Sequence, residues 1–300
     1  MSFSYDVKSE LCKIRSSGCC KFAQFYGMLL FSRAFSVDCV SIATEHEIVC
    51  STYTHLLNRC FNIHAPVETS GQKRKTFKAS VPGKIDRKRI VTYFGQSSTE
   101  INDEIIKRDC CKAAFLRGVF LVCGIIVDPN KDYCVEFVLP DSPICDSFVK
   151  FLNELNLTPR ISKRGNRKIV YFKDSDQIEV LLTKIKASHY TLELMSIKIY
   201  KDIRNKVNRK NNCETANISK TVAAAVEQTR AIEYLEDTGL LYMLPAELVS
   251  AAMLRKINPS SSLNELCERS SDPITRSGLN HRLQKLVAIA KEEMESEKEE

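Results

Sequence analysis

Polar side chains of the types that recognise nucleic-acid bases are concentrated between residues 275 and 285. Arginine can donate two parallel hydrogen bonds to guanine, and asparagine or glutamine can exchange a matched pair of bonds with adenine. At about 100° per residue, a helix would separate these side chains from an apolar stripe on its opposite side. The polar side comprises Arg276, Ser277, Asn280, His281 and Gln284, and the stripe comprises Leu279, Leu283, Leu286 and Ala290.

Three further residues border this polar side. Arg282 and Lys285 flank it, and we expect them to contact phosphates, while Thr275 opens the segment. The sequence predicts a short helix from Ser262 to Arg269, an interruption at residues 272–275, and a longer helix to about residue 293. A short helix, a tight turn and a longer basic helix form a helix-turn-helix. The alternative is a three-helix unit with a solvated or protein-binding polar face, in which His281 is structural.

Gly278 lies inside the longer predicted helix. Glycine at such a position costs about 1 kcal/mol relative to alanine. A close approach of the preceding helix, or of a sugar-phosphate chain, would justify it.

Basic residues are also concentrated in two short segments. Residues 72–90 hold eight Lys/Arg and one acid, and residues 157–173 hold six and none. These 36 residues carry a net charge of +13, whereas the rest of the chain sums to −6. Each segment contains a predicted hairpin, turning at Gly71 or at Gly165. The candidate DNA-contacting residues in these hairpins are Lys73, Arg74, Lys75, Lys78, Arg160, Lys163, Arg164, Arg167 and Lys168.

The two basic segments occupy corresponding places, which suits a sheet face laid along phosphates. The alternative is that these long side chains are solvated and protect the edge strands from pairing with other chains. Charge alone does not distinguish DNA from RNA.

The predicted elements around the hairpins occur twice in the same order. In each copy an apolar helix is followed by strand, helix, hairpin and helix. The first copy is predicted at residues 22–32, 37–43 and 46–61, at a hairpin centred on Gly71 with its second arm at 73–78, and at 84–93; the second is predicted at 111–124, 133–139, 142–156, 160–173 and 175–186.

The remaining chain is predicted to be helical. We expect a double repeat over residues 1–187, with copies at about 19–95 and 109–187, a basic connector at 188–220, and a helical domain at 221–300 with its motif at about 261–294. Helices are predicted at 221–238, where Gly239 ends the helix, and at 245–257. The composition leaves open whether the connector is a stiff helix or a hinge. The glutamate-rich tail from Lys291 is predicted to fray.

Thirteen cysteines are scattered along the chain without a C-x-x-C pair. We interpret them as reduced thiols of a soluble cytoplasmic protein, because the charged first residues do not resemble a signal peptide and the longest apolar run, Val119–Val127, is too short to span a membrane. Cys19-Cys20 and Cys110-Cys111 precede the apolar helices and are expected to be core or boundary thiols, since neighbouring cysteines do not easily ligate one tetrahedral ion. No metal site, cofactor or small-molecule substrate is predicted, and the sequence holds no nucleotide-binding, hydrolase or zinc-protease motif.

Residues Leu116–Gly124 resemble the LAGLIDADG motif of homing endonucleases, and residues 25–33 are a weaker copy with Arg33 in place of glycine. In that family two such helices pack at a pseudo-twofold axis, and an acid at the end of each holds divalent metals. The matching positions here are Ser32 and Cys123, which cannot replace carboxylates for magnesium. The resemblance therefore implies the scaffold without catalysis. A residual nuclease is the less favoured alternative.

The whole chain resembles the WhiA family of bacterial regulators. The match is carried by residues 1–11, by the polar stretch Asn208–Asn217, and by the end from Leu244 through Thr275–Leu283. The resemblance implies an α+β fold in which an αββαββα unit occurs twice, followed by an all-α helix-turn-helix domain similar to sigma factor region 4. It also implies a non-enzymatic protein that binds double-stranded DNA in the nucleoid.

The same resemblance implies roles in transcription, cell division, chromosome segregation and, in spore formers, sporulation. In actinobacterial relatives it implies a regulatory partner of the WhiB type. A second interpretation makes the double repeat a protein-interaction platform, with DNA binding weak or limited to the C-terminal domain.

Overall fold

The computed structural model describes residues 2–32, 34–72, 74–95 and 99–299, with side chains to residue 296. Lys73 and Arg33 lie outside the described residues. The chain divides into two compact units, Met1–Lys201 and Asp202–Glu300. Among the described residues, no helix combines the length and the hydropathy that a bilayer crossing requires.

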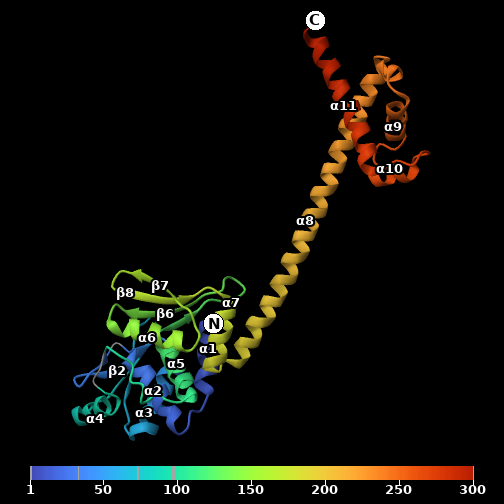
Figure 1. The fold of residues 1–300 in the computed structure, drawn as a ribbon. Helices are drawn as coiled ribbons and strands as arrows, with labels where there is room; N and C mark the ends of the chain where they lie inside the picture. The colour runs from blue at the N-terminus through green and yellow to red at the C-terminus, as the bar shows by residue number, and fades with distance from the viewer. Residues whose placement is uncertain (1, 33, 73, 96–98, 300) are drawn as a thin grey trace. The chain divides into compact units, whose positions relative to one another are not determined.

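The first unit contains the predicted repeat, with the order αββαββα occurring twice (Figure 1). Each predicted strand near the start of a repeat is the second arm of a short antiparallel hairpin. The first copy consists of α2 (Cys19–Leu30), β1 (Ala34–Phe35), β2 (Val40–Thr44), α3 (Glu47–Phe61), β3 (Val67–Ser70), β4 (Thr76–Ser80) and α4 (Lys84–Phe94). The second copy consists of α5 (Asp109–Cys123), β5 (Gly124–Ile126), β6 (Val135–Pro140), α6 (Pro143–Glu154), β7 (Arg160–Arg164), β8 (Arg167–Phe172) and α7 (Ser175–Ile185).

Each copy forms a four-stranded antiparallel sheet of the same topology. The strand orders are β1-β2-β4-β3 and β5-β6-β8-β7. Alternate side chains of the central strands are buried, as Val135, Phe137 and Leu139 show in β6. Because successive strand residues point to opposite faces, each sheet has one face toward the core and one outer face.

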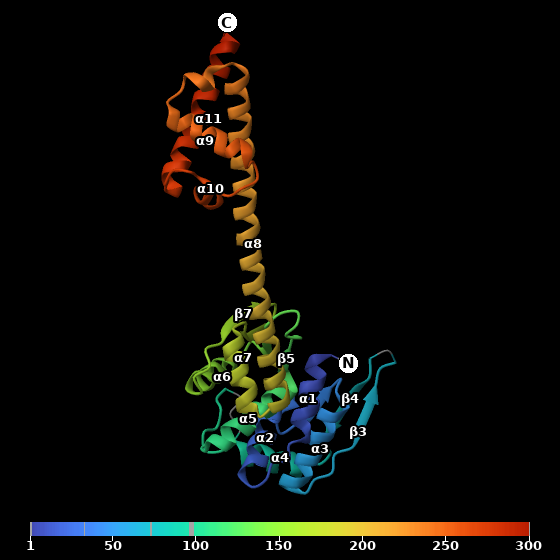
Figure 2. The ribbon, with the colours of Figure 1, turned by 90° about the vertical axis from the view of Figure 1, so that its right-hand side faces the viewer.

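Helices α2 and α5 lie side by side at the centre of this unit (Figures 1 and 2). Their backbones approach closely at two glycines. A Cβ at Gly27 would overlap the carbonyl oxygen of Phe115, and one at Gly118 would overlap that of Gln24. The two motif copies therefore pack backbone to backbone, as the LAGLIDADG resemblance implies.

Two helical features differ from the expectations. An unpredicted helix, α1 (Phe3–Lys13), is capped by the Ser2 side chain. The connector does not end before a separate helix, because α8 runs without a break from Ser188 to Asp237. These 50 residues contain no glycine or proline, so nothing in the sequence interrupts the backbone hydrogen bonds. Gly239, with φ 75°, follows the end of α8 as predicted.

In the second unit, α9 (Ala246–Ile257), α10 (Leu263–Arg269) and α11 (Arg276–Glu299) pack with the end of α8 (Figure 2). A short 3₁₀ turn, Leu240–Met243, precedes α9, and Pro245 is its N-cap rather than its first residue. Helix α11 continues through the acidic tail, since glutamate and lysine are good helix formers.

Candidate nucleic-acid interface

The predicted two-sided character of α11 is confirmed. Leu279, Leu283, Leu286 and Ala290 are each 1% exposed or less and form part of the core of the second unit. This burial fixes the rotation of the helix, so the opposite side must face away from the core. The residues on that opposite side are exposed, except that Asn280 is half-buried; they are Arg276, Ser277, Asn280, His281, Gln284 and Lys285.

The start of α11 is held by local hydrogen bonds. Thr275 accepts from the backbone N–H of Gly278 through its hydroxyl (3.2 Å) and from that of Leu279 through its carbonyl (2.9 Å). Upstream, Ser262 and Glu265 form a reciprocal capping box at α10. Thr275 is thus occupied as a cap, which orients the first turn of α11.

The preceding helix does not explain Gly278. A Cβ there would meet only Thr275 Oγ1, at 3.2 Å, and Ile274 Cγ1, at 3.5 Å, among the described atoms. Of the two reasons that the sequence suggested, a close approach of α10 is wrong. The side of the helix at Gly278 is open to an approaching chain.

The polar face separates into free and engaged side chains. Arg282 donates to Glu247 of α9 at 2.8 Å, which ties α11 to its neighbour. Arg276, Asn280, His281, Gln284 and Lys285 have no hydrogen-bond or ion-pair partner among the residues that the structure describes. Their donors and acceptors are available to a ligand.

The sequence reasoning missed Arg255, which holds the turn between α9 and α10. Its guanidinium is 2% exposed and donates to Gln228 Oε1 (3.0 Å) and to the carbonyl oxygen of Ser261. Burial lowers the pKa of Arg255. A basic residue near the end of a predicted helix gives no signal by itself that it folds inward to fix the following turn.

Strand register divides the predicted hairpin residues of the second repeat into two groups. Arg160, Arg164 and Arg167 share a face with Glu136 and Tyr171, opposite the buried Phe137 and Val170. These three arginines are exposed and unpaired among the described residues, so the outer face of the second sheet carries a cluster of free guanidinium groups.

Lys163 and Lys168 lie on the other face, cross-strand from each other. Lys163 is paired with Asp141 at 2.7 Å, and Lys168 contacts Asp141 at 3.6 Å and Asp146 at 3.0 Å. Hydrogen bonding to Lys163 lowers the pKa of Asp141. The two lysines are neutralised locally and do not share the arginine face.

The first repeat presents a smaller basic group. Lys78 is exposed on the outer face of the first sheet, directly across from Glu68 on β3. Arg74 and Lys75 are exposed between the strands of the hairpin, and Lys73 is not among the described residues. The two repeats therefore place basic side chains at corresponding places, with the stronger cluster in the second.

At the C-terminal ends of α2 and α5, the described residues Ser32 and Cys123 occupy the positions of the motif's acids and do not offer carboxylates to a divalent metal. Ser32 uses its hydroxyl to donate to the carbonyl oxygen of Leu29 (2.7 Å), and the Cys123 thiol donates to that of Val119 (3.2 Å). Burial raises the pKa of Cys123 to about 12 and lowers that of neighbouring Lys8 to about 8. Neutral hydroxyl and thiol groups beside a lysine do not supply the anionic oxygens that magnesium requires.

The N-terminal ends of the same helices carry the two cysteine pairs. Both pairs lie inside the first turns of α2 and α5, not before the helices as predicted. The Sγ atoms of Cys19, Cys20, Cys110 and Cys111 all lie within 4.8 Å of one another. The prediction of core or boundary thiols agrees with the burial of Cys111, but it did not anticipate that the packing of the repeats brings the two pairs together, although the matching positions of the pairs were the available signal.

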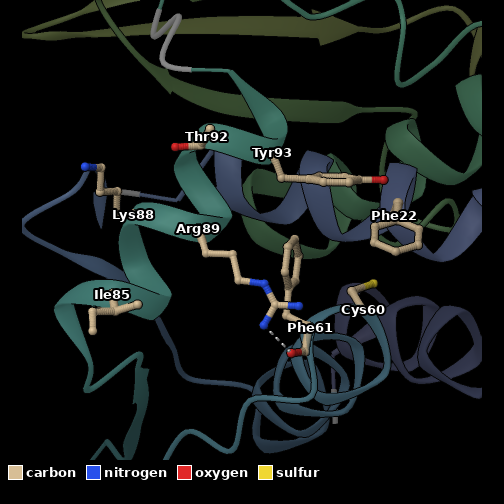
Figure 3. Close-up of a pocket in the computed structure, with 8 residues that line it drawn as sticks. All are labelled: Phe22, Cys60, Phe61, Ile85, Lys88, Arg89, Thr92 and Tyr93. Carbon is tan, nitrogen blue, oxygen red and sulfur yellow. Dashed lines mark hydrogen bonds between the residues drawn. The ribbon is translucent and has the colours of Figure 1, made fainter.

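A pocket of about 690 Å³ lies between α2, α3 and α4 (Figure 3). Arg89 crosses it and donates to the carbonyl oxygen of Phe61 at 3.3 Å. Phe22 and Tyr93 line one side and Ile85, which is 84% exposed, stands at its edge. Its described lining holds no carboxylate, so it offers a surface for an apolar group rather than acid–base chemistry.

Comparisons with known proteins match both units. The profile described as the WhiA LAGLIDADG-like domain matches residues 112–204, and that of the WhiA C-terminal HTH domain matches residues 207–290. A "Probable cell division protein WhiA" of Carboxydothermus hydrogenoformans is 37% identical over 303 residues, covering 97% of each chain. One of Clostridium botulinum is 34% identical over 316 residues, covering 97% of this chain and 98% of its own.

A solved structure has the same fold. The crystal structure of full-length DUF199/WhiA from Thermatoga maritima superposes with a TM-score of 0.61 at 22% identity, covering 97% of this chain and 99% of that one. The fold and the helix arrangement together define a protein with a LAGLIDADG-like double repeat and a C-terminal helix-turn-helix domain. The chain belongs to the WhiA family.

Proposed function

We propose that this protein binds double-stranded DNA sequence-specifically, with α11 as the recognition helix. The observation that carries the proposal is the free polar face of α11, held outward by the buried leucine stripe. Arg276 and Asn280 lie one helical turn apart, and Gln284 lies one turn further. This spacing lets successive side chains reach successive base edges in a major groove. Lys285 would flank the groove at the phosphates, and Arg282 would contribute less there, because it is already paired with Glu247.

The outer sheet faces of the double repeat are proposed to hold the DNA backbone. Arg160, Arg164 and Arg167 would contact phosphates in the second repeat, with Lys78 and the turn residues Arg74 and Lys75 in the first. Lys163 and Lys168 would contribute less, because their charges are already paired with Asp141 and Asp146. Residues 1–187 would act as this gripping domain, residues 188–220 of α8 as the connector, and residues 221–300 as the reading domain.

The double repeat is proposed to be a homing-endonuclease scaffold without catalysis. Ser32 and Cys123 stand where the motif has metal-binding acids, and Lys8 is buried beside Cys123. DNA binding would therefore proceed without cleavage.

The proposed cellular role is transcriptional control of cell division. The relatives from Carboxydothermus hydrogenoformans and Clostridium botulinum are each described as a probable cell division protein. Roles in chromosome segregation and in sporulation, and a cytoplasmic location on the nucleoid, belong to the same proposal.

Selection of bound duplexes from a random pool, using the intact chain with magnesium present, tests the proposal. We expect one enriched motif, retention of full-length duplex, and loss of enrichment at high salt. A pool that remains random after repeated rounds would contradict sequence-specific binding, and cleaved duplex would contradict the inactive scaffold.

A protein-interaction role for the double repeat is the second candidate. The pocket of Figure 3 favours it, because Ile85 and Tyr93 expose apolar surface beside Arg89. Replacing Ile85 with Asp should then remove a protein partner, such as a regulator of the WhiB type, from pull-downs without changing DNA affinity. Equal recovery of partners by both proteins would count against this role.

A further inference from the structure

Two pairs of adjacent cysteines, one from each repeat, meet where α2 and α5 begin. We propose that Cys19, Cys20, Cys110 and Cys111 form a structural site for one zinc ion. The four Sγ atoms already lie within 4.8 Å of one another, although the two pairs are about ninety residues apart in the chain. The proposal is independent of DNA binding.

Neighbouring cysteines do not easily ligate one tetrahedral ion, but here the geometry of the cluster overcomes that difficulty, because the two Sγ atoms of each pair already lie within 4.8 Å of each other and of the other pair. With Zn–S bonds of about 2.3 Å, the sulfurs of a tetrahedral site are about 3.8 Å apart, so small side-chain rotations would complete the site. Disulfides would need sulfurs at about 2.05 Å and would use them two at a time. An iron–sulfur cluster would hold the four cysteines further apart, because several irons lie between them. Four thiolates select a soft or borderline ion over magnesium or calcium.

The surroundings supply positive charge for a tetrathiolate, which retains a net charge of −2 around Zn²⁺. Arg117 is 3% exposed and close enough to Cys20 for their charges to interact. Among described residues its hydrogen bonds go only to neutral acceptors: Gln24 Oε1 (3.1 Å), Ser16 Oγ (2.7 Å) and the carbonyl oxygen of Ile185 (3.3 Å). Its buried charge is therefore left without a carboxylate. The N-terminal ends of two helices add further positive potential.

The site is open enough for an ion to enter. Cys19 and Cys110 are exposed, Cys20 is half-buried and Cys111 is buried. On binding, four S–H bonds break, four Zn–S bonds form, and four protons pass to solvent. The hydrogen bond from the Cys20 thiol to the carbonyl oxygen of Cys110 (3.4 Å) is lost in this exchange. With all four positions occupied by protein, the ion would join the two helices and have no open position for catalysis.

Cobalt titration of the full-length protein tests the site, because tetrahedral cobalt thiolates have an intense charge-transfer band. The metal-free, reduced protein should bind about one cobalt ion per chain with this spectrum, and zinc should displace it. The variant Cys19→Ser/Cys110→Ser should lose the band, and the control Cys39→Ser/Cys213→Ser, which removes two exposed cysteines outside the cluster, should keep it. The single variant Cys19→Ser should give a weaker, shifted band, because one sulfur ligand is lost.

Thermal unfolding provides a second readout. Stoichiometric zinc should raise the Tm of the wild type and of the control, but not of the cluster variant. Metal-free wild-type protein that binds no cobalt, or a cluster variant that binds it equally well, would overturn the proposal. A wild-type Tm that does not respond to zinc would overturn the structural role.

Discussion

Helix α11 and the outer face of the second sheet both carry exposed arginine, but they offer different chemistry. The polar side of α11 combines Arg276 with Asn280 and Gln284, which have acceptors as well as donors. The face with Arg160, Arg164 and Arg167 supplies cationic donors. Base edges present donors and acceptors in a pattern, whereas phosphates present acceptors alone. Within the proposed function, this difference assigns recognition of the base sequence to the helix and binding of the DNA backbone to the sheets.

The largest expected effect comes from removing only the side chains of α11 that are proposed to contact base edges. Arg276→Ala/Asn280→Ala should reduce the preference for a selected motif over random DNA by roughly 10²- to 10⁴-fold, because each bidentate base contact contributes about 1–3 kcal/mol. Competition binding with motif and random duplexes measures this ratio.

The matched control for that test is Arg230→Ala/Asn217→Ala, which removes the same side-chain types from exposed positions of α8. It should leave the preference unchanged. Equal losses in the two variants would mean that α11 does not read sequence.

Charge reversal of the arginine cluster addresses gripping. Arg160→Glu, Arg164→Glu and Arg167→Glu together should weaken binding to all sequences alike. They should reduce the slope of log K against log salt by about 3, since each phosphate contact contributes about 0.9. Titrations at several salt concentrations measure the slope.

The control is a triple charge reversal elsewhere in the same unit, at Lys107, Lys150 and Lys184. These lysines lie in a loop, on α6 and on α7 rather than on the outer sheet face. The effect of this control on the slope should be clearly smaller. If the two triple variants behave alike, the sheet is not a DNA surface.

A substitution at Gly278 distinguishes an effect on folding from an effect on DNA binding at this position of α11. Gly278→Ala should raise the free energy of unfolding by less than about 1 kcal/mol, because the gain in helix propensity is partly offset by the 3.2 Å contact of the new Cβ with Thr275 Oγ1, which caps this turn. Affinity for DNA should fall about tenfold if the phosphate chain approaches this site, the equivalent of about 1.4 kcal/mol. Thermal unfolding and binding isotherms of the same preparation check both effects. Unchanged affinity would remove the DNA explanation for this glycine.

The smallest expected effect distinguishes two neighbours on β8. Lys168→Gln should change DNA affinity less than about twofold, because its charge is already paired with Asp141 and Asp146. Arg167→Gln, on the opposite face, should weaken binding several-fold and reduce the salt slope by about 1. A larger effect at Lys168 than at Arg167 would mean that DNA contacts the face of Lys168, which would contradict the proposed role of the arginine face.

The features of the fold that follow from the spacing of apolar residues were predictable from local sequence. Alternation in β6 and the leucine spacing in α11 each report burial of one face, and both predictions are confirmed. The double repeat was visible because Gly71 and Gly165 mark hairpins at corresponding places. Such signals need only a few consecutive residues.

Features that depend on distant contacts were not predictable in this way. Arg255 is buried because the fold brings its hydrogen-bond acceptors on Gln228 and Ser261 together, and no local sequence pattern predicts this arrangement. The gathering of Arg160, Arg164 and Arg167 on one face required the register between β7 and β8. The cysteine cluster required the packing of two helices whose cysteines are about ninety residues apart.

The glycine contact between α2 and α5 also has a consequence for folding during synthesis. Gly27 leaves the ribosome about ninety residues before Gly118, so α2 is complete long before its partner exists. Until then Tyr26 and Phe31, whose rings contact Phe115 of α5 in the finished protein, have no α5 to pack against. During synthesis the first repeat therefore persists as a folding intermediate with exposed apolar surface, the kind of species that chaperones bind. The interface that unites the repeats thus makes the first one dependent on the second for its own completion.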